Sequence, residues 1–100
     1  MTLLKTKNMD NFKLGKEINI TGLSKKSIIN IPYHTIESVF GQPTIIENNH
    51  YAIWKLRFED TEESIAILND NENYLETDRW IIKATDLNNI ERVKNILASI

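Results

Sequence analysis

The segment 31–68, together with the tryptophan at position 80, constrains the fold more than any other part of this chain. Its first part predicts a short helix, because Pro32 suits a first helical turn and the apolar residues that follow share one face. These apolar residues are Tyr33, Ile36, Val39 and Phe40. Gly41 and Pro43 end the helix, since glycine accommodates a left-handed backbone and proline prevents the helix from resuming.

Alternation of apolar and charged residues predicts the strands that follow. Trp54, Leu56 and Phe58 alternate with lysine, arginine and glutamate, which is typical of a strand with one buried face. The polar, acidic segment 60–63 predicts a tight turn. The chain then returns over 64–68 as an antiparallel partner, so the two strands form a hairpin.

A third strand begins at Trp80. Trp80 and Ile82 share one face of this strand, and Ile81 lies on the other. If Ile53 or Ile81 lies on the sheet face away from the helices, its apolar surface would favour a partner or a second copy. The segment 44–51 is predicted to link helix and sheet through an Asn48-Asn49 turn.

The C-terminal segment predicts an amphipathic helix. Asp86 or Asn88 can cap its N-terminus, and Glu91 stands where a capping-box partner of Asn88 would lie. Arg92 and Lys94 are expected to face outwards. The buried stripe consists of Ile90, Val93, Ile96, Leu97 and Ile100.

These elements predict an α+β, two-layer domain in which a short helix and a C-terminal helix pack on an antiparallel sheet. Because strand pairs lack crossover helices, the sheet is expected to be antiparallel. Residues 1–13 are predicted to form a loosely ordered arm or an edge strand, and 14–100 a single domain. A short strand around Ile18 and Ile20 is expected at its start. Residues 25–27 are expected to lead into a second strand, or an extended lead-in to the helix, over 28–31.

Charge is unevenly distributed along the chain. Residues 1–30 hold six lysines against two acids, a net +4, whereas residues 31–100 carry a net −6. Between positions 59 and 78 there is no lysine or arginine, and the acids there are predicted to form one partner-binding face. They are Glu59, Asp60, Glu62, Glu63, Asp70, Glu72, Glu76 and Asp78. The competing interpretation is a solvated surface that only improves solubility.

Several chemistries are excluded or disfavoured by the sequence. The absence of cysteine removes disulfides, thiol catalysis and cysteine-ligated metals. His34 and His50 each lie without a second ligand at metal-binding spacing, and no glycine-rich phosphate loop exists. No apolar run is long enough for a signal peptide or a membrane span. We therefore predict a cytoplasmic, non-enzymatic protein without metal or cofactor.

The order of motifs resembles a pattern in small proteins encoded by bacteriophages and other viruses. It comprises a helix ending in Phe40-Gly41-Gln42-Pro43, the 54–60 strand with its acidic turn, and the Trp80 strand. Members of this type often carry glycines where this chain has Thr61-Glu62 and Lys83-Ala84. The helix-then-hairpin order is also similar to β-lactamase-inhibitor-like domains. The resemblance implies a host-interaction protein of the anti-CRISPR type, active in the host cytoplasm.

Three function classes follow. The leading hypothesis is a protein-binding inhibitor of a host or defence protein, with a basic partner on the acidic face and a toxin-immunity protein as its alternative. The second is a nucleic-acid-associated protein that uses the lysine-rich N-terminal third. Its lysines are Lys5, Lys7, Lys13, Lys16, Lys25 and Lys26. The third is an enzyme or small-ligand protein that uses scattered carboxylates or His34. A homodimer is left open.

Overall fold

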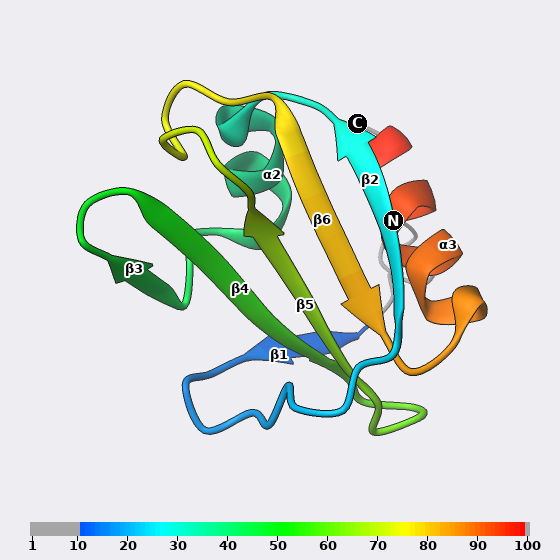
Figure 1. Ribbon diagram of the computed structural model, residues 1–100. Coiled ribbons are helices and arrows are strands. Elements are labelled where there is room, and N and C mark those ends of the chain that lie inside the picture. The colour runs from blue at the N-terminus through cyan, green and yellow to red at the C-terminus, as the bar shows by residue number, and fades with distance from the viewer. Residues whose placement is uncertain (1–10, 100) are drawn as a thin grey trace, which may run out of the picture.

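The computed structural model describes residues 11–99 and has an α+β architecture, as predicted. Within these residues, two strands are followed by a helix, four further strands and a second helix (Figure 1). Their bounds are β1 Phe12–Leu14, β2 Lys25–Asn30, α2 Tyr33–Phe40, β3 Ile45–Glu47, β4 Tyr51–Phe58, β5 Ser64–Asn69, β6 Arg79–Ala84 and α3 Leu87–Ala98.

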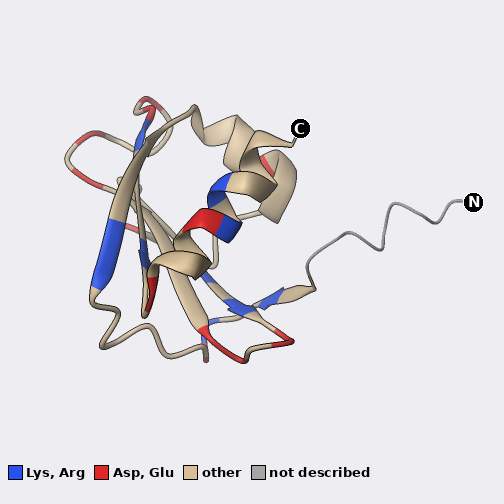
Figure 2. Cartoon of the chain, turned by 90° about the vertical axis from the view of Figure 1, so that its right-hand side faces the viewer, with Lys and Arg blue, Asp and Glu red and all other residues tan. Residues whose placement is uncertain are grey.

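The six strands form one antiparallel sheet with the order β1-β4-β5-β6-β2, and β3 also pairs with β4. Both helices lie on the same side of this sheet, and no helix of residues 11–99 covers its other face (Figure 1). The side view in Figure 2 shows the sheet and the helices as two layers. The predicted two-layer, antiparallel arrangement is therefore confirmed.

The core lies between the sheet and the helices, and the alternation in β4 produces it. Trp54, Leu56 and Phe58 are fully buried on the helix side, opposite Ile65 and Ile67 of β5. Trp80 from β6 completes the centre, and its ring meets that of Trp54 edge-on at 5.4 Å between centroids.

The two helices end and begin as the sequence predicts. Gly41 follows α2 with a φ of 83°, and its N–H donates to the Glu37 carbonyl, so this position requires the freedom of glycine. Asp86 caps α3 by accepting a hydrogen bond from the Asn89 N–H. Arg92 was expected to face outwards, but its guanidinium lies 3.8 Å from the centre of the Phe58 ring. Its long side chain folds back over the core because the cation stacks on an aromatic face.

One local prediction is wrong, and one short strand was not predicted. The chain forms no strand at Ile18 or Ile20; it runs irregularly from β1 to β2, and Ile18 is buried within that connection. The link over 44–51 contains β3, which turns into β4 through Asn48 and Asn49, both with positive φ. Residues 1–10 of the expected arm lie outside the described residues, and Phe12–Leu14 forms β1.

Candidate functional site

The sheet face opposite the helices carries a continuous row of aliphatic side chains. Each member lies directly across from the next on the neighbouring strand, so the row crosses five strands. This aliphatic row consists of Ile45, Ile53, Leu68, Ile81 and Ile28. All five are partly or fully exposed, and Ile28 reaches 45%. Ile53 and Ile81 therefore both lie on the face away from the helices, the arrangement that favours a partner.

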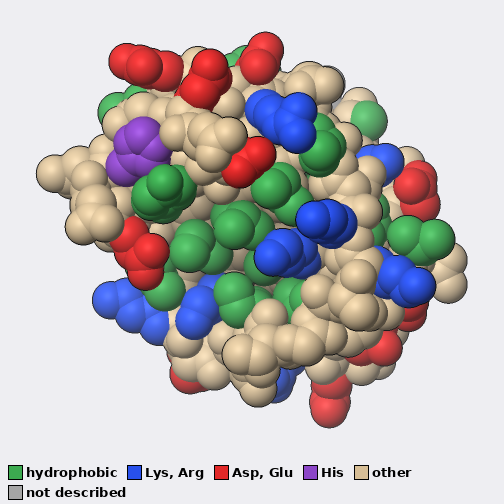
Figure 3. Space-filling view, viewed as in Figure 1, with side chains coloured by type: hydrophobic (Ala, Val, Ile, Leu, Met, Phe, Trp, Pro, Cys, Tyr) green, Lys and Arg blue, Asp and Glu red, His purple; other side chains and the backbone are tan. Residues whose placement is uncertain are grey.

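A band of basic side chains lies beside the aliphatic row on the same face. This basic band consists of Lys13, Lys26, Lys55, Arg57 and Lys83. Lys26, Lys55 and Lys83 each lie two residues, or about 7 Å, along the strand from a member of the aliphatic row. Arg57 lies two residues beyond Lys55, opposite Lys13. Figure 3 shows this face, with hydrophobic side chains at its centre, Lys and Arg among and beside them, and Asp and Glu mostly at the periphery.

The basic band contains two like-charged pairs that face each other directly across strands. Lys26 of β2 lies opposite Lys83 of β6, and Lys13 of β1 lies opposite Arg57 of β4. Like charges in this position destabilise a sheet. Lys55 relieves part of its own charge by donating to the Lys16 carbonyl at 3.1 Å. The face therefore concentrates positive charge at a cost to the free protein, which an anionic partner would offset.

Reversing one charge of the Lys26–Lys83 pair is expected to stabilise the free protein. Lys83→Glu replaces a repulsive pair by an attractive one, and should raise the free energy of unfolding by about 0.2–1 kcal/mol at low salt. Urea unfolding measures the gain, which should shrink as salt is added. Lys25→Glu is the matched control, because Lys25 lies opposite Ala84. An equal gain in both variants would contradict pairwise repulsion as the cause.

The eight acidic residues predicted as one face are divided into two groups. Glu59, Asp60, Glu62 and Glu63 lie in the β4–β5 turn, and Asp70, Glu72, Glu76 and Asp78 lie in the β5–β6 loop. The two groups are at opposite ends of β5, about 20 Å apart for a six-residue strand. Proximity along the sequence thus does not bring them together, and their partner-binding role stays a prediction.

Some of these carboxylates already have partners within the chain. Asp60 accepts two hydrogen bonds from the Arg92 guanidinium, both at 3.0 Å. Glu63 accepts from the Asn89 side chain, which ties the β4–β5 turn to α3. Asp70 lies 3.7 Å from the Arg79 guanidinium. These contacts give three of the eight carboxylates a structural role.

The Asp60–Arg92 pair makes the free energy of unfolding depend on pH in the acidic range. Hydrogen bonding from Arg92 holds the pKa of the Asp60 carboxyl below its ordinary value of 3.8. The contribution to stability is therefore present above that value and is lost as pH falls through the lower pKa of the folded state. Arg92→Met keeps the apolar stem over Phe58 and removes the charge. Unfolding in urea from about pH 5 to about pH 2 should show a shallower loss of stability in this variant. An unchanged pH profile would contradict the role of the pair.

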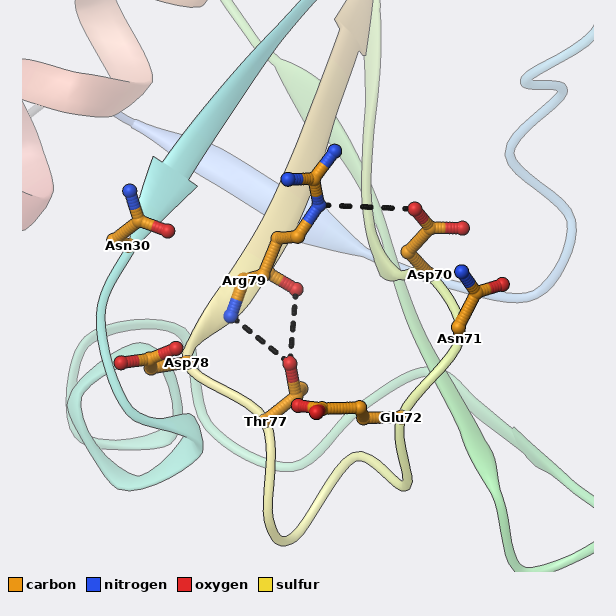
Figure 4. Close-up of a pocket in the computed structure, with 7 residues that line it drawn as sticks. All are labelled: Asn30, Asp70, Asn71, Glu72, Thr77, Asp78 and Arg79. Carbon is orange, nitrogen blue, oxygen red and sulfur yellow. Dashed lines mark hydrogen bonds and ion pairs between the residues drawn. The ribbon is translucent and has the colours of Figure 1, made fainter.

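The β5–β6 loop borders an open hollow of about 490 Å³. It is lined by Asn30, Asp70, Asn71, Glu72, Thr77, Asp78 and Arg79 (Figure 4). The Thr77 hydroxyl accepts from the Arg79 N–H at 3.0 Å and donates to the Arg79 carbonyl, so it closes the turn. The lining residues include no histidine, and the Thr77 hydroxyl is engaged in this turn.

The β5–β6 loop is held to the β3–β4 turn by a polar network. Asn69, only 3% exposed, accepts from the Ala52 N–H and donates to the carbonyls of His50 and Glu72. The His50 ring bonds the Asn71 carbonyl at 2.8 Å. Sequence reasoning could not identify this partner of His50, because it is a backbone atom 21 residues along the chain.

In the part of the chain that the structure describes, the potential metal ligands do not gather into one site. Within residues 11–99, no group of three or more His, Asp or Glu side chains could hold a metal ion. His34 is exposed on α2 and lies 3.3 Å from Glu37, its neighbour on the next turn. The two histidines occupy different elements, and neither lines the open hollow.

The lysines of the N-terminal third do not gather on one surface either. Lys13 and Lys26 belong to the basic band, whereas Lys25 is directed to the helix side of β2 and Lys16 lies in the β1–β2 connection. Lys5 and Lys7 lie outside the described residues. What the sequence reasoning missed is the contribution of the central strands, Lys55, Arg57 and Lys83, to this positive surface.

Comparison of the chain with known protein families, with curated proteins and with solved structures finds no match. Neither of the described helices is long and apolar enough to cross a membrane. The function therefore has to be argued from the surface of the sheet itself.

Proposed function

We propose that this chain is a non-enzymatic protein-binding domain that inhibits a host or defence protein, and that it contacts its partner through the open face of the sheet. The observation that carries the proposal is the aliphatic row beside the basic band. Exposed apolar surface of this kind is where partners bind, and the positive charge of the basic band favours an acidic partner. The partner chemistry is thus the reverse of the basic partner expected from the acidic segment 59–78.

The composition of the face favours a protein over a nucleic acid. Single-stranded nucleic acids bind sheets through aromatic side chains on which bases stack. Among the outward-facing positions of the described strands, Tyr51 is the one aromatic residue, and it is 38% exposed. Nucleic acid is the second candidate, because the basic band could hold phosphates.

The proposal is tested by capture from a bacterial host lysate on the tagged chain. The wild type should retain one stoichiometric protein after nuclease treatment, with less retained as salt rises. Ile53→Asp combined with Ile81→Asp should abolish retention, because it places two charges in the aliphatic row. Both positions are only partly buried, and unfolding midpoints verify that the variant folds.

The matched control reverses charge at the ends of the sheet. Glu62→Lys combined with Glu72→Lys changes two exposed carboxylates, one in each acidic group. This variant should retain the partner if the open face binds it. Loss of the partner here, with retention in the aliphatic-row variant, would establish the acidic ends as the binding surface. Capture of nucleic acid alone would favour the second candidate, and no capture would refute the proposal.

A further inference from the structure

The strand β2 forms an edge of the sheet. It pairs with β6 on one side, and no strand among residues 11–99 pairs with it on the other. In an antiparallel strand every second residue directs its N–H and C=O away from the paired neighbour, so these groups are open to another chain. Figure 2 looks onto this edge, where β2 is the strand at the left with a blue segment near its lower end, and α3 lies to one side of it.

An apolar hollow of about 110 Å³ lies between this edge and α3. It is lined by Ile29, Ile31, Lys94, Leu97 and Ala98. The hollow is therefore placed beside the end of β2 and the last turn of α3, where a side chain from an added strand would point. Its size suits a single branched aliphatic side chain.

The start of β2 is positively charged, because Lys25 and Lys26 begin this strand. Lys94 is the one charged residue that lines the hollow, and its ammonium lies 3.5 Å from the Glu91 carboxylate on the same helix. No acidic residue lies in β2 or in the lining of the hollow. A segment with Asp or Glu beside an aliphatic residue would complement this charge.

A second copy of the chain fits this edge poorly. Its own β2 would bring two more lysines and no acidic residue to this edge. A second copy therefore does not complement the positive charge at the start of β2. The occupant that fits is a single extended segment that carries acidic residues.

We propose that β2 binds an extended acidic segment of a protein partner as an added strand, with one aliphatic side chain of that segment in the hollow beside α3. Main-chain hydrogen bonds to the edge and a side-chain pocket are the two elements of this recognition mode. The inference rests on the proposed function, since Ile28 belongs both to this edge and to the aliphatic row.

The test uses displayed random linear peptides, panned on the full chain. The enriched peptides should carry one aliphatic residue flanked by Asp or Glu. An enriched peptide is then synthesised with N-methyl groups on alternate amides, in each of the two phases. One phase should lower affinity on the order of tenfold for each hydrogen bond lost, and the other should not. Equal binding of both phases, or no enrichment, would overturn the inference.

Variants of the chain locate the peptide and separate the two proposals. Ala98→Phe fills the hollow from an exposed position and should lower peptide affinity more than tenfold. Lys94→Glu should shift the enriched peptides from acidic to basic. Ile46→Asp should leave peptide affinity unchanged, because Ile46 is an exposed residue of β3, at the opposite end of the sheet from β2. If Ile53→Asp weakens the peptide and Ala98→Phe does not, the inference fails and the open face is the peptide site. If the peptide behaves as expected but the lysate yields no partner, only the proposed function fails.

Discussion

Replacing Trp54 with alanine is expected to lower the free energy of unfolding by about 3–5 kcal/mol. The side chain is fully buried at the centre of the core, where it contacts the rings of Trp80 and Tyr33 at 5.4 and 5.8 Å between centroids. A domain of this size has a total stability of about 5–15 kcal/mol, so the variant should be close to unfolding at room temperature. Urea unfolding followed by far-UV circular dichroism measures the change.

Phenylalanine variants at the two tryptophans separate packing from hydrogen bonding. The Trp54 indole N–H donates to the Gly41 carbonyl at 2.9 Å, whereas the Trp80 indole N–H is buried without a partner among the described residues. Trp54→Phe removes a hydrogen bond, and Trp80→Phe removes an unpaired polar group. Trp54→Phe should therefore be the more destabilising by about 1 kcal/mol. The opposite order would show that the bond to Gly41 contributes little.

Asn69→Ala is expected to cost about 2–4 kcal/mol, although it removes only a small polar side chain. The substitution leaves the Ala52 N–H and the carbonyls of His50 and Glu72 without the partner that Asn69 provides. Because these groups join β4, β5 and the β5–β6 loop, the loop should also loosen. Hydrogen exchange across 70–78 should accelerate together with the loss of stability.

Two neighbouring variants make the Asn69 prediction specific. Asn69→Asp keeps the oxygen that accepts from the Ala52 N–H, but it removes the amide that donates to two carbonyls. The buried carboxylate then faces these carbonyl oxygens, so this variant should lose at least as much stability as Asn69→Ala. Asn71→Ala is the matched control, since the Asn71 side chain is exposed and its backbone carbonyl is what bonds His50. A cost below about 1 kcal/mol for Asn69→Ala would show that water replaces the network.

Elements with a strong local signal could be predicted from the sequence. The periodicity of Ile36 and Phe40, with Gly41 after them, identifies α2, and alternation around Trp54 identifies β4. The strand β3 gives no such signal, because three residues cannot establish a period. The placement of β2 beside β6 was also beyond prediction, since alternation specifies which face is buried but not which strand lies next to it.

The candidate site was harder to predict than the fold for a related reason. The acidic residues between 59 and 78 are close in sequence. Half of them lie in the β4–β5 turn and half in the β5–β6 loop, however, and these two segments are separated by the full length of β5. The open face did have a local signal, in the alternation of Ile53, Lys55 and Arg57 with the buried residues of β4. Its like-charged pair Lys26–Lys83 joins distant segments, so only the strand order reveals it.

The position of β2 has a consequence for the synthesis of the protein on the ribosome. β2 is synthesised before its neighbour β6, and α2, β3, β4 and β5 all emerge in between. The β4–β5 hairpin can close as it emerges, whereas β2 must wait for a contact of long sequence separation, which is slow to form. During that interval, Lys25 and Lys26 act as charged gatekeepers beside the apolar residues of the waiting strand. The same lysines that attract an acidic segment to the finished domain thus protect the nascent chain from premature association.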